Sequence, residues 1–321
     1  MAITNWGTGV TVTFPTNCTM TVSSTGVPPF HNTYYLAPAA AGQTVVATTQ
    51  SGIQLAVTPY SGGISTVNKV SATFNICPTK AASTTSSSFG AIGFISSGEV
   101  LFNPYEATST VAMGDNASYT FSTGGVSYTA YFIDQCNSHA AGGMGANSGS
   151  TWHYHAVPVC WTATVDGATG PSHIIGIAID GYPVYGGRDI NGNAVATTSL
   201  DACNGITSPT PEFPSGAYHY VLPLNTTTKQ SSINCYTGTV GTTVMAWSQQ
   251  MKCKMLMAMQ MASGETPKWV PALPPVAGSF AAKNLAAAQQ NVMPTMNTMD
   301  MAAMSPINNP KIGGSHQEIG R

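Results

Sequence analysis

Charged side chains are scarce in this sequence. Its 321 residues include 10 Lys and Arg against 12 Asp and Glu, so that 7% of the chain is charged and the net charge is −2. A typical soluble domain is about 25% charged. Ten scattered cations cannot form the basic patch that neutralises several phosphates, which argues against nucleic acid as a partner. The apolar fraction of 43% still allows a substantial buried core in a chain of this length.

Long apolar runs are also missing. No segment approaches the roughly 18–20 residues that a membrane-spanning helix needs, so we expect no membrane span. Residues 1–13 show neither the basic start nor the apolar stretch of a signal peptide, and the sequence is interpreted as a mature form with an added or retained Met1. A weakly charged surface of Thr, Ser, Asn and Gly favours a secreted, periplasmic or cell-surface location.

No C-x₂-C pair is present, which argues against a cytosolic zinc framework. In an oxidising compartment most of the cysteines would instead be paired. There are seven, at positions 18, 77, 136, 160, 203, 235 and 253. The sequence also lacks a nucleophile elbow, a zincin helix and a P-loop, so no reaction is indicated by a motif.

Residues 1–248 are predicted to form a mainly β body. Val10–Phe14 and Tyr119–Ser122 alternate apolar with polar side chains, which is the period of a half-buried strand. Gly-Gly, Asp-Gly and Asn-Gly pairs separate such segments and indicate turns. The body is therefore expected to consist of strands joined by tight turns.

Three sequence blocks recur in the same order within this body. Gly93–Phe102 aligns with Gly176–Tyr185, Asp134–Asn137 with Asp201–Asn204, and Trp152–His155 with Tyr218–Val221. An internal repeat of this kind predicts a duplicated, sandwich-like β unit with a pseudo-twofold axis. The two halves would extend over about residues 90–165 and 173–240.

The repeat also predicts the disulfides. Cys136 and Cys203 occupy equivalent positions, and each is followed by one further body cysteine. The implied pairs are Cys136–Cys160 and Cys203–Cys235, which leaves Cys18–Cys77 for the N-terminal strands. A bridge between Cys136 and Cys203 would contradict this symmetric interpretation.

The blocks resemble the YHYH-domain family of secreted proteins. The resemblance covers about residues 90–240 and is carried by Asp134-x-Cys136, Trp152-His153-Tyr154-His155, Ser172-His173, Asp180-Gly181-Tyr182-Pro183, Asp201-Ala-Cys203-Asn204-Gly205 and Tyr218-His219-Tyr220. It departs from the family pattern at Trp152, where the family usually has Tyr, and at Val221, where the second block often has His. The resemblance implies a secreted, disulfide-bonded β domain suspected of binding metal, with no established reaction.

The histidines of the first half are the candidate metal ligands. On a strand, side chains alternate, so His153 and His155 point to the same face and could share one metal ion. His139 belongs to the same half, His173 opens the next, and His219 would join through the repeat. The second half has Val221 in place of His155 and Ile206 in place of His139, so the first half should carry most of the site. The alternative is that these are buried core histidines satisfied by tyrosine hydroxyls.

Residues 249–321 are expected to form a Met-rich tail, helical or extended. Two methionine clusters lie at 251–261 and 293–304, and thioether sulfur is a soft ligand that favours Cu(I). The candidate ligands in the first cluster are Met251, Cys253, Met255 and Met259. Packing of a helix against the body would explain the same cluster. Cys253, which has no predicted partner, could be buried, bound to metal or bridged to another chain.

Histidine and methionine clusters in one extracellular chain favour copper over zinc, because imidazole suits Cu(II) and thioether suits Cu(I). Asp189–Asn193 resembles part of a calcium loop without its full register, so zinc and calcium are kept as alternatives. Our first hypothesis is an extracytoplasmic copper-binding protein for uptake, storage or surface display. The second is a structural surface or assembly subunit, which could be a homo-oligomer. The third is a metal-dependent oxidoreductase or hydrolase, in which Asp134 or Asp180 could act as a base or orient an imidazole.

Overall fold

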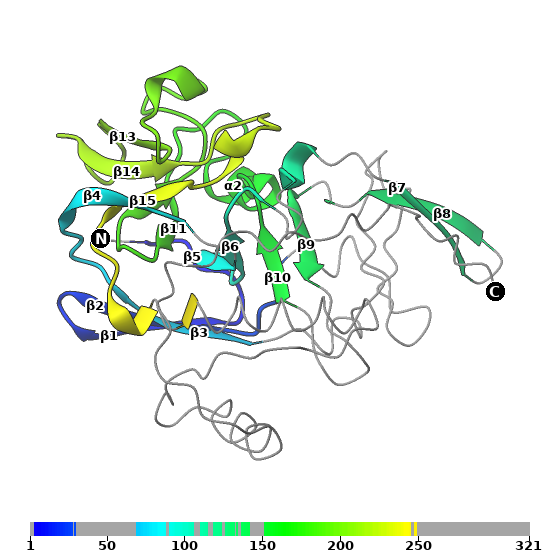
Figure 1. Cartoon of the computed structure of the whole chain (residues 1–321), viewed down its shortest axis with the longest axis horizontal. Helices are drawn as coiled ribbons and strands as arrows, with labels where there is room; N and C mark the ends of the chain where they lie inside the picture. The colour runs from blue at the N-terminus through cyan, green and yellow to red at the C-terminus, as the bar shows by residue number, and fades with distance from the viewer. Residues whose placement is uncertain are drawn as a thin grey trace, which may run out of the picture. The chain divides into compact units, whose positions relative to one another are not determined.

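The computed structural model describes residues 3–27, 69–87, 90–105, 110–114, 118–123, 126–131, 136–141, 151–244 and 247–248, with single residues at 29 and 133. These residues are mainly β (Figure 1), which confirms the predicted fold class. By internal contacts the chain divides into Met1–Pro271 and Ala272–Arg321, and every described residue lies in the first unit. The predicted Met-rich tail and the boundary at 248/249 lie outside the part that is described.

An eight-stranded sheet forms the centre of the described body. Its strands, in order across the sheet, are β13 (Gly205–Ser208), β14 (Ala217–Val221), β12 (Pro183–Tyr185), β11 (Ile174–Ala178), β5 (Ala91–Ile95), β6 (Val100–Phe102), β10 (Thr151–Tyr154) and β9 (Ser138–Ala141). In each half an antiparallel pair (β5 with β6, β11 with β12) is followed by a parallel neighbour and an antiparallel end strand. The predicted repeat is therefore two copies of one four-stranded unit.

The two units meet along β5 and β11, and their register is symmetric. Phe94 pairs with Ile177 at the centre, while Gly93 pairs with Ala178 and Gly176 with Ile95. Exchanging the two halves turns the Gly93 pair into the Gly176 pair, as a pseudo-twofold axis between the strands requires. A Cβ on Gly93 would lie 2.7 Å from the carbonyl oxygen of Ile177, and one on Gly176 would lie 2.5 Å from that of Phe94. Both glycines thus allow the close approach of the two central strands.

A second layer packs against this sheet. It is an antiparallel sheet of β1 (Val10–Thr16), β2 (Thr19–Ser24) and β3 (Val70–Asn75). Alternate residues of β2 and β3 are buried and share one apolar cluster with the central strands of the large sheet. The cluster includes Met20, Val22, Phe74, Ile92, Phe94, Ile177, Tyr154 and Tyr220. Because both layers bury one face in the same core, the body has the two-layer organisation of a sandwich.

The remaining described elements are short. They are β4 (Lys80–Ser86) paired with β15 (Cys235–Gly238), β7 (Ser118–Thr123) paired with β8 (Val126–Tyr131), the helix α2 (Val159–Val165), and 3₁₀ turns at Ala112–Gly114, Thr197–Ser199 and Lys229–Ser231. The helix α2 directly follows the first histidine block, and the strand pattern of the sequence did not indicate it. None of the described helices is long and apolar enough to cross a membrane.

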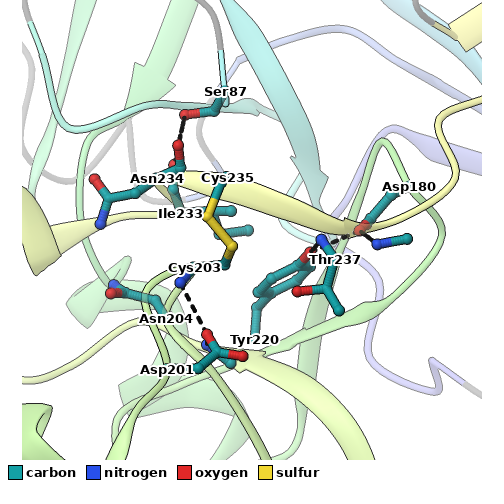
Figure 2. The surroundings of a disulfide bond; sticks show 12 residues. Ser87, Asp180, Asp201, Cys203, Asn204, Tyr220, Ile233, Asn234, Cys235 and Thr237 are labelled. Atoms are coloured by element: carbon teal, nitrogen blue, oxygen red, sulfur yellow. Dashed lines mark hydrogen bonds between the residues drawn. A yellow bond between two sulfur atoms is a disulfide. The ribbon is translucent and has the colours of Figure 1, made fainter. Parts of the chain in front are cut away.

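Three disulfides join Cys18 to Cys77, Cys136 to Cys160 and Cys203 to Cys235. The pairing predicted from the repeat is confirmed. Figure 2 shows the Cys203–Cys235 bridge and the turn beside it, in which Asp201 Oδ1 accepts hydrogen bonds from the backbone N–H groups of Cys203 and Gly205, each at 2.8 Å. Asn204, which follows Cys203, has a φ of +66°, and its equivalent Asn137 has a φ of +65°. Asn tolerates this left-handed conformation, so the recurring Cys-Asn pair places a left-handed residue after the bridged cysteine in both halves.

Candidate metal centre

Two neighbouring strands bring three histidines of the first half together. His153 on β10 lies directly opposite His139 on β9 in the antiparallel ladder. His155 follows the end of β10 and, two residues from His153, projects from the same face. The exposed fractions of His139, His153 and His155 are 4%, 2% and 1%. The predicted His-x-His arrangement therefore forms a buried cluster of three imidazoles.

Backbone carbonyls determine which ring nitrogen of His153 and of His155 carries the proton. His153 Nδ1 lies 2.9 Å from the carbonyl oxygen of Thr151, and His155 Nδ1 lies 2.6 Å from that of Asn103. A carbonyl oxygen only accepts hydrogen bonds, so each Nδ1 carries the hydrogen and donates it. In the neutral rings both Nε2 atoms are consequently unprotonated and present a lone pair.

These two Nε2 atoms face one another at 3.0 Å. Two lone pairs at that distance repel unless a cation lies between or beside them, and the cation can be a shared proton or a metal ion. Donation of Nδ1–H to a backbone carbonyl, with Nε2 turned toward the ion, is the usual second-shell arrangement of a metal-binding histidine. The three-histidine cluster could therefore hold a metal ion.

The spacing of the three rings fits one ion. One ligand atom from each of His139, His153 and His155 can be chosen so that all three lie within 4.8 Å of one another. Nitrogen ligands at about 2.0–2.1 Å from one tetrahedral ion lie about 3.3 Å apart, so the widest pair of ligand atoms would have to approach by up to about 1.5 Å to bind one ion. The Phe102 ring stacks on His153, with centroids 3.9 Å apart, and restricts the orientation of that ring.

The sequence profile of the family described as "YHYH protein" matches residues 71–197 and 189–238. These segments span more than half of the chain and contain both histidine blocks. The chain belongs to the YHYH family. No curated protein and no solved structure gives a significant match to it.

The second half of this YHYH protein repeats part of the centre. His219 on β14 lies opposite Ile206, as His153 lies opposite His139, and His219 Nδ1 lies 2.9 Å from the carbonyl oxygen of Ala217. The Tyr185 ring packs against His219 with centroids 4.6 Å apart, in the position that Phe102 occupies beside His153. Val221 takes the place of His155, so one histidine remains where the first half has three. Burial lowers the pKa of His219 below its usual value.

His219 and His173 do not lie with the three-histidine cluster. Four strands separate β14 from β10 in the sheet, which places the two histidine blocks about 24 Å apart at the usual strand spacing. His173 lies just before β11, and its Nδ1 is 2.9 Å from Glu212 Oε1. The other oxygen of Glu212 accepts a hydrogen bond from the Tyr185 hydroxyl at 2.9 Å. Glu212, which lies outside the recurring blocks, thus joins His173 to Tyr185, a connection that the sequence pattern does not indicate.

The two aspartates considered as bases have different positions. Asp180 is buried and accepts hydrogen bonds from the Tyr220 hydroxyl at 2.6 Å and from Gly238 N–H at 2.8 Å (Figure 2). Burial raises its pKa above the usual value, and its partners belong to the second half. Asp134 is outside the described residues.

Asp189, which opens the candidate calcium loop, is not part of the three-histidine cluster. Asp189 Oδ1 accepts the backbone N–H groups of Asn191 and Asn193, each at 2.9 Å, which is the hydrogen bonding of a tight Asx turn. Met251, Cys253, Met255 and Met259 lie outside the described residues.

Proposed function

We propose that this YHYH protein is an extracytoplasmic copper-binding protein that holds one ion through His139, His153 and His155. The observation that carries the proposal is the 3.0 Å contact between the Nε2 atoms of His153 and His155, both of which carry a lone pair because Nδ1 donates to a carbonyl. A copper ion would receive both lone pairs and remove their repulsion. His139 would supply the third nitrogen.

Several features support copper within this proposal. All three candidate ligands are imidazoles, which suit copper as well as zinc, and no carboxylate belongs to the group. Three disulfides within the described residues are typical of a protein folded in an oxidising compartment. Copper cycles between two oxidation states in such a space, and the methionine-rich sequence at 251–261 and 293–304 offers soft ligands for the reduced state. These properties suit uptake, storage or surface display of copper.

The test is metal content and affinity in matched variants. Protein purified without a histidine tag is exposed separately to Cu(I) without oxygen, Cu(II) in air and Zn(II), then dialysed and analysed for bound metal. One copper ion per chain is expected. The variant His153→Gln, His155→Gln should lose that ion, while His219→Gln, at the equivalent position of the second half, should keep it.

Three results would overturn the proposal. No retained copper in the wild-type protein would leave a proton shared by His153 and His155, and a structural subunit would then be the better account. Unchanged binding in the double variant would exclude the His-x-His ligands. Tighter retention of Zn(II) than of either copper ion would reject copper. Circular dichroism and the three intact disulfides verify that each variant is folded.

A further inference from the structure

The three candidate ligands lie between Cys136 and Cys160 in the sequence, and a disulfide joins these two cysteines. Cys136 is buried and precedes β9, which carries His139, whereas Cys160 lies in α2 directly after the block that carries His153 and His155. The bridge therefore connects the segment that supplies one ligand to the segment that supplies the other two.

Within the part of the chain that is described, β9 is the last strand of the large sheet, and β10 is its one strand partner. A hydrogen bond beside the disulfide links the same two segments: Asn137 Nδ2 donates to the carbonyl oxygen of Val157 at 2.8 Å. The disulfide and this hydrogen bond fix the start of β9 to the residues that follow the His-x-His block. Together with the antiparallel β9–β10 ladder, they fix the position of His139 relative to the other two rings.

We infer that an intact Cys136–Cys160 disulfide is required for tight copper binding at His139, His153 and His155, so that reduction of this bridge releases the ion. The inference rests on the proposed function. Reduction by a dithiol breaks the S–S bond, adds one hydrogen to each sulfur, and converts the dithiol into a disulfide. The start of β9 is then held by noncovalent contacts alone, and His139 can move away from the ion.

The coupling must act in both directions. If the disulfide favours metal binding, bound metal favours the disulfide by the same factor, because both are equilibria of one molecule. Metal-loaded protein should therefore resist reduction at Cys136–Cys160. This reciprocity separates a bridge coupled to the site from one that stabilises the body in general.

The internal repeat provides a matched control. Cys203–Cys235 begins at the cysteine equivalent to Cys136, and each of these cysteines is followed by an Asn of positive φ. The strands beside Cys203–Cys235 carry Ile206 and Val221 where the first half has ligands. Loss of this bridge removes a comparable loop constraint from a segment that carries none of the three candidate ligands and that contacts the metal centre through the backbone, where Ser231 Oγ donates to the carbonyl oxygen of His155 at 2.9 Å. If removal of a bridge acted only by lowering the stability of the body, removal of either bridge would weaken copper binding to the same extent.

The first experiment compares Cys136→Ser, Cys160→Ser with Cys203→Ser, Cys235→Ser. Cu(I) affinity is measured by competition with a coloured chelator in the absence of oxygen. We expect about tenfold or greater weakening in the first variant and a change of less than about twofold in the second. Equal affinities in the two variants would overturn the coupling.

The second experiment needs no substitution and so does not depend on the folding of a variant. Wild-type protein, with and without Cu(I), is treated with a water-soluble phosphine, which reduces a disulfide to two thiols while it takes an oxygen atom from water. Alkylation and peptide mass spectrometry then follow each bridge. Copper should slow the reduction of Cys136–Cys160 and leave that of Cys203–Cys235 unchanged. Equal protection of both bridges, or of neither, would contradict the inference.

The outcomes distinguish the two proposals. Wild-type protein that binds no copper refutes the proposed function. Wild-type protein that binds copper, with equal behaviour of both bridges, refutes the coupling alone.

Discussion

His153 and His219 make the same hydrogen bond in the two halves of the sheet. Each donates Nδ1–H to the carbonyl oxygen of the residue two positions earlier, at 2.9 Å in both cases. Each also packs against an aromatic ring at the end of the parallel neighbouring strand. The duplicated unit therefore keeps the orientation of one imidazole while the residues around it differ, and this difference can be tested.

Restoring the missing histidines should create a second metal site. Ile206 and Val221 occupy the register positions of His139 and His155 around His219. The variant Ile206→His, Val221→His should bind two copper ions per chain, because His219 already presents its Nε2 lone pair. Metal analysis after dialysis checks this prediction. A stoichiometry that stays at one would show that the second half does not reproduce the geometry of the first.

The hydrogen bond between Tyr220 and Asp180 should contribute strongly to stability. The Tyr220 hydroxyl donates to the buried carboxylate and accepts Thr237 N–H at 2.8 Å. Tyr220→Phe leaves the Asp180 carboxylate and the Thr237 N–H without this partner. The substitution should lower the free energy of unfolding by about 2–3 kcal/mol.

Tyr236→Phe is the control for that prediction. Tyr236 is equally buried, and its hydroxyl has no hydrogen-bond partner among the described residues, so removing it should cost less than about 0.5 kcal/mol. Urea unfolding of both variants measures the difference. Similar losses would contradict the assignment of the Tyr220 hydrogen bonds.

The stability of the metal-free protein should fall in mild acid, in part through His219. Burial lowers the folded-state pKa of His219 below the usual 6.5, so the unfolded chain binds a proton at a higher pH than the folded chain does. The contribution of His219 to the free energy of unfolding is therefore fully present above about pH 6.5 and decreases as the pH falls toward the folded-state pKa.

Comparison of the wild-type protein with His219→Gln isolates this contribution. The difference between their free energies of unfolding, measured by urea denaturation at several pH values, should be constant above about pH 6.5. Below that pH the wild-type protein should lose more stability than the variant. A difference that does not change with pH would show that burial of His219 does not affect its protonation.

The repeated blocks made much of the body predictable from sequence. Equivalent cysteines imply equivalent bridges, and the strand period alone places His153 and His155 on one face. Both inferences depend on local spacing or on the repeat, and neither requires knowledge of how the halves join.

The distance between the two histidine blocks could not be obtained in that way. The halves join through β5 and β11, whose close contact depends on glycines, so the histidine strands lie on opposite sides of the sheet centre. His219 is consequently remote from His153, although the repeat makes them equivalent. The contacts of Glu212 with His173 and Tyr185 could not be predicted either, because Glu212 lies in a turn between two strands of the second half.

The most direct test of the account is the location of copper in crystals of the loaded protein. An anomalous difference map recorded at the copper edge should show one peak about 2.0–2.1 Å from Nε2 of both His153 and His155, with His139 as the third ligand. A copper peak elsewhere on the chain, with the two Nε2 atoms still in contact at 3.0 Å, would contradict the proposed metal centre.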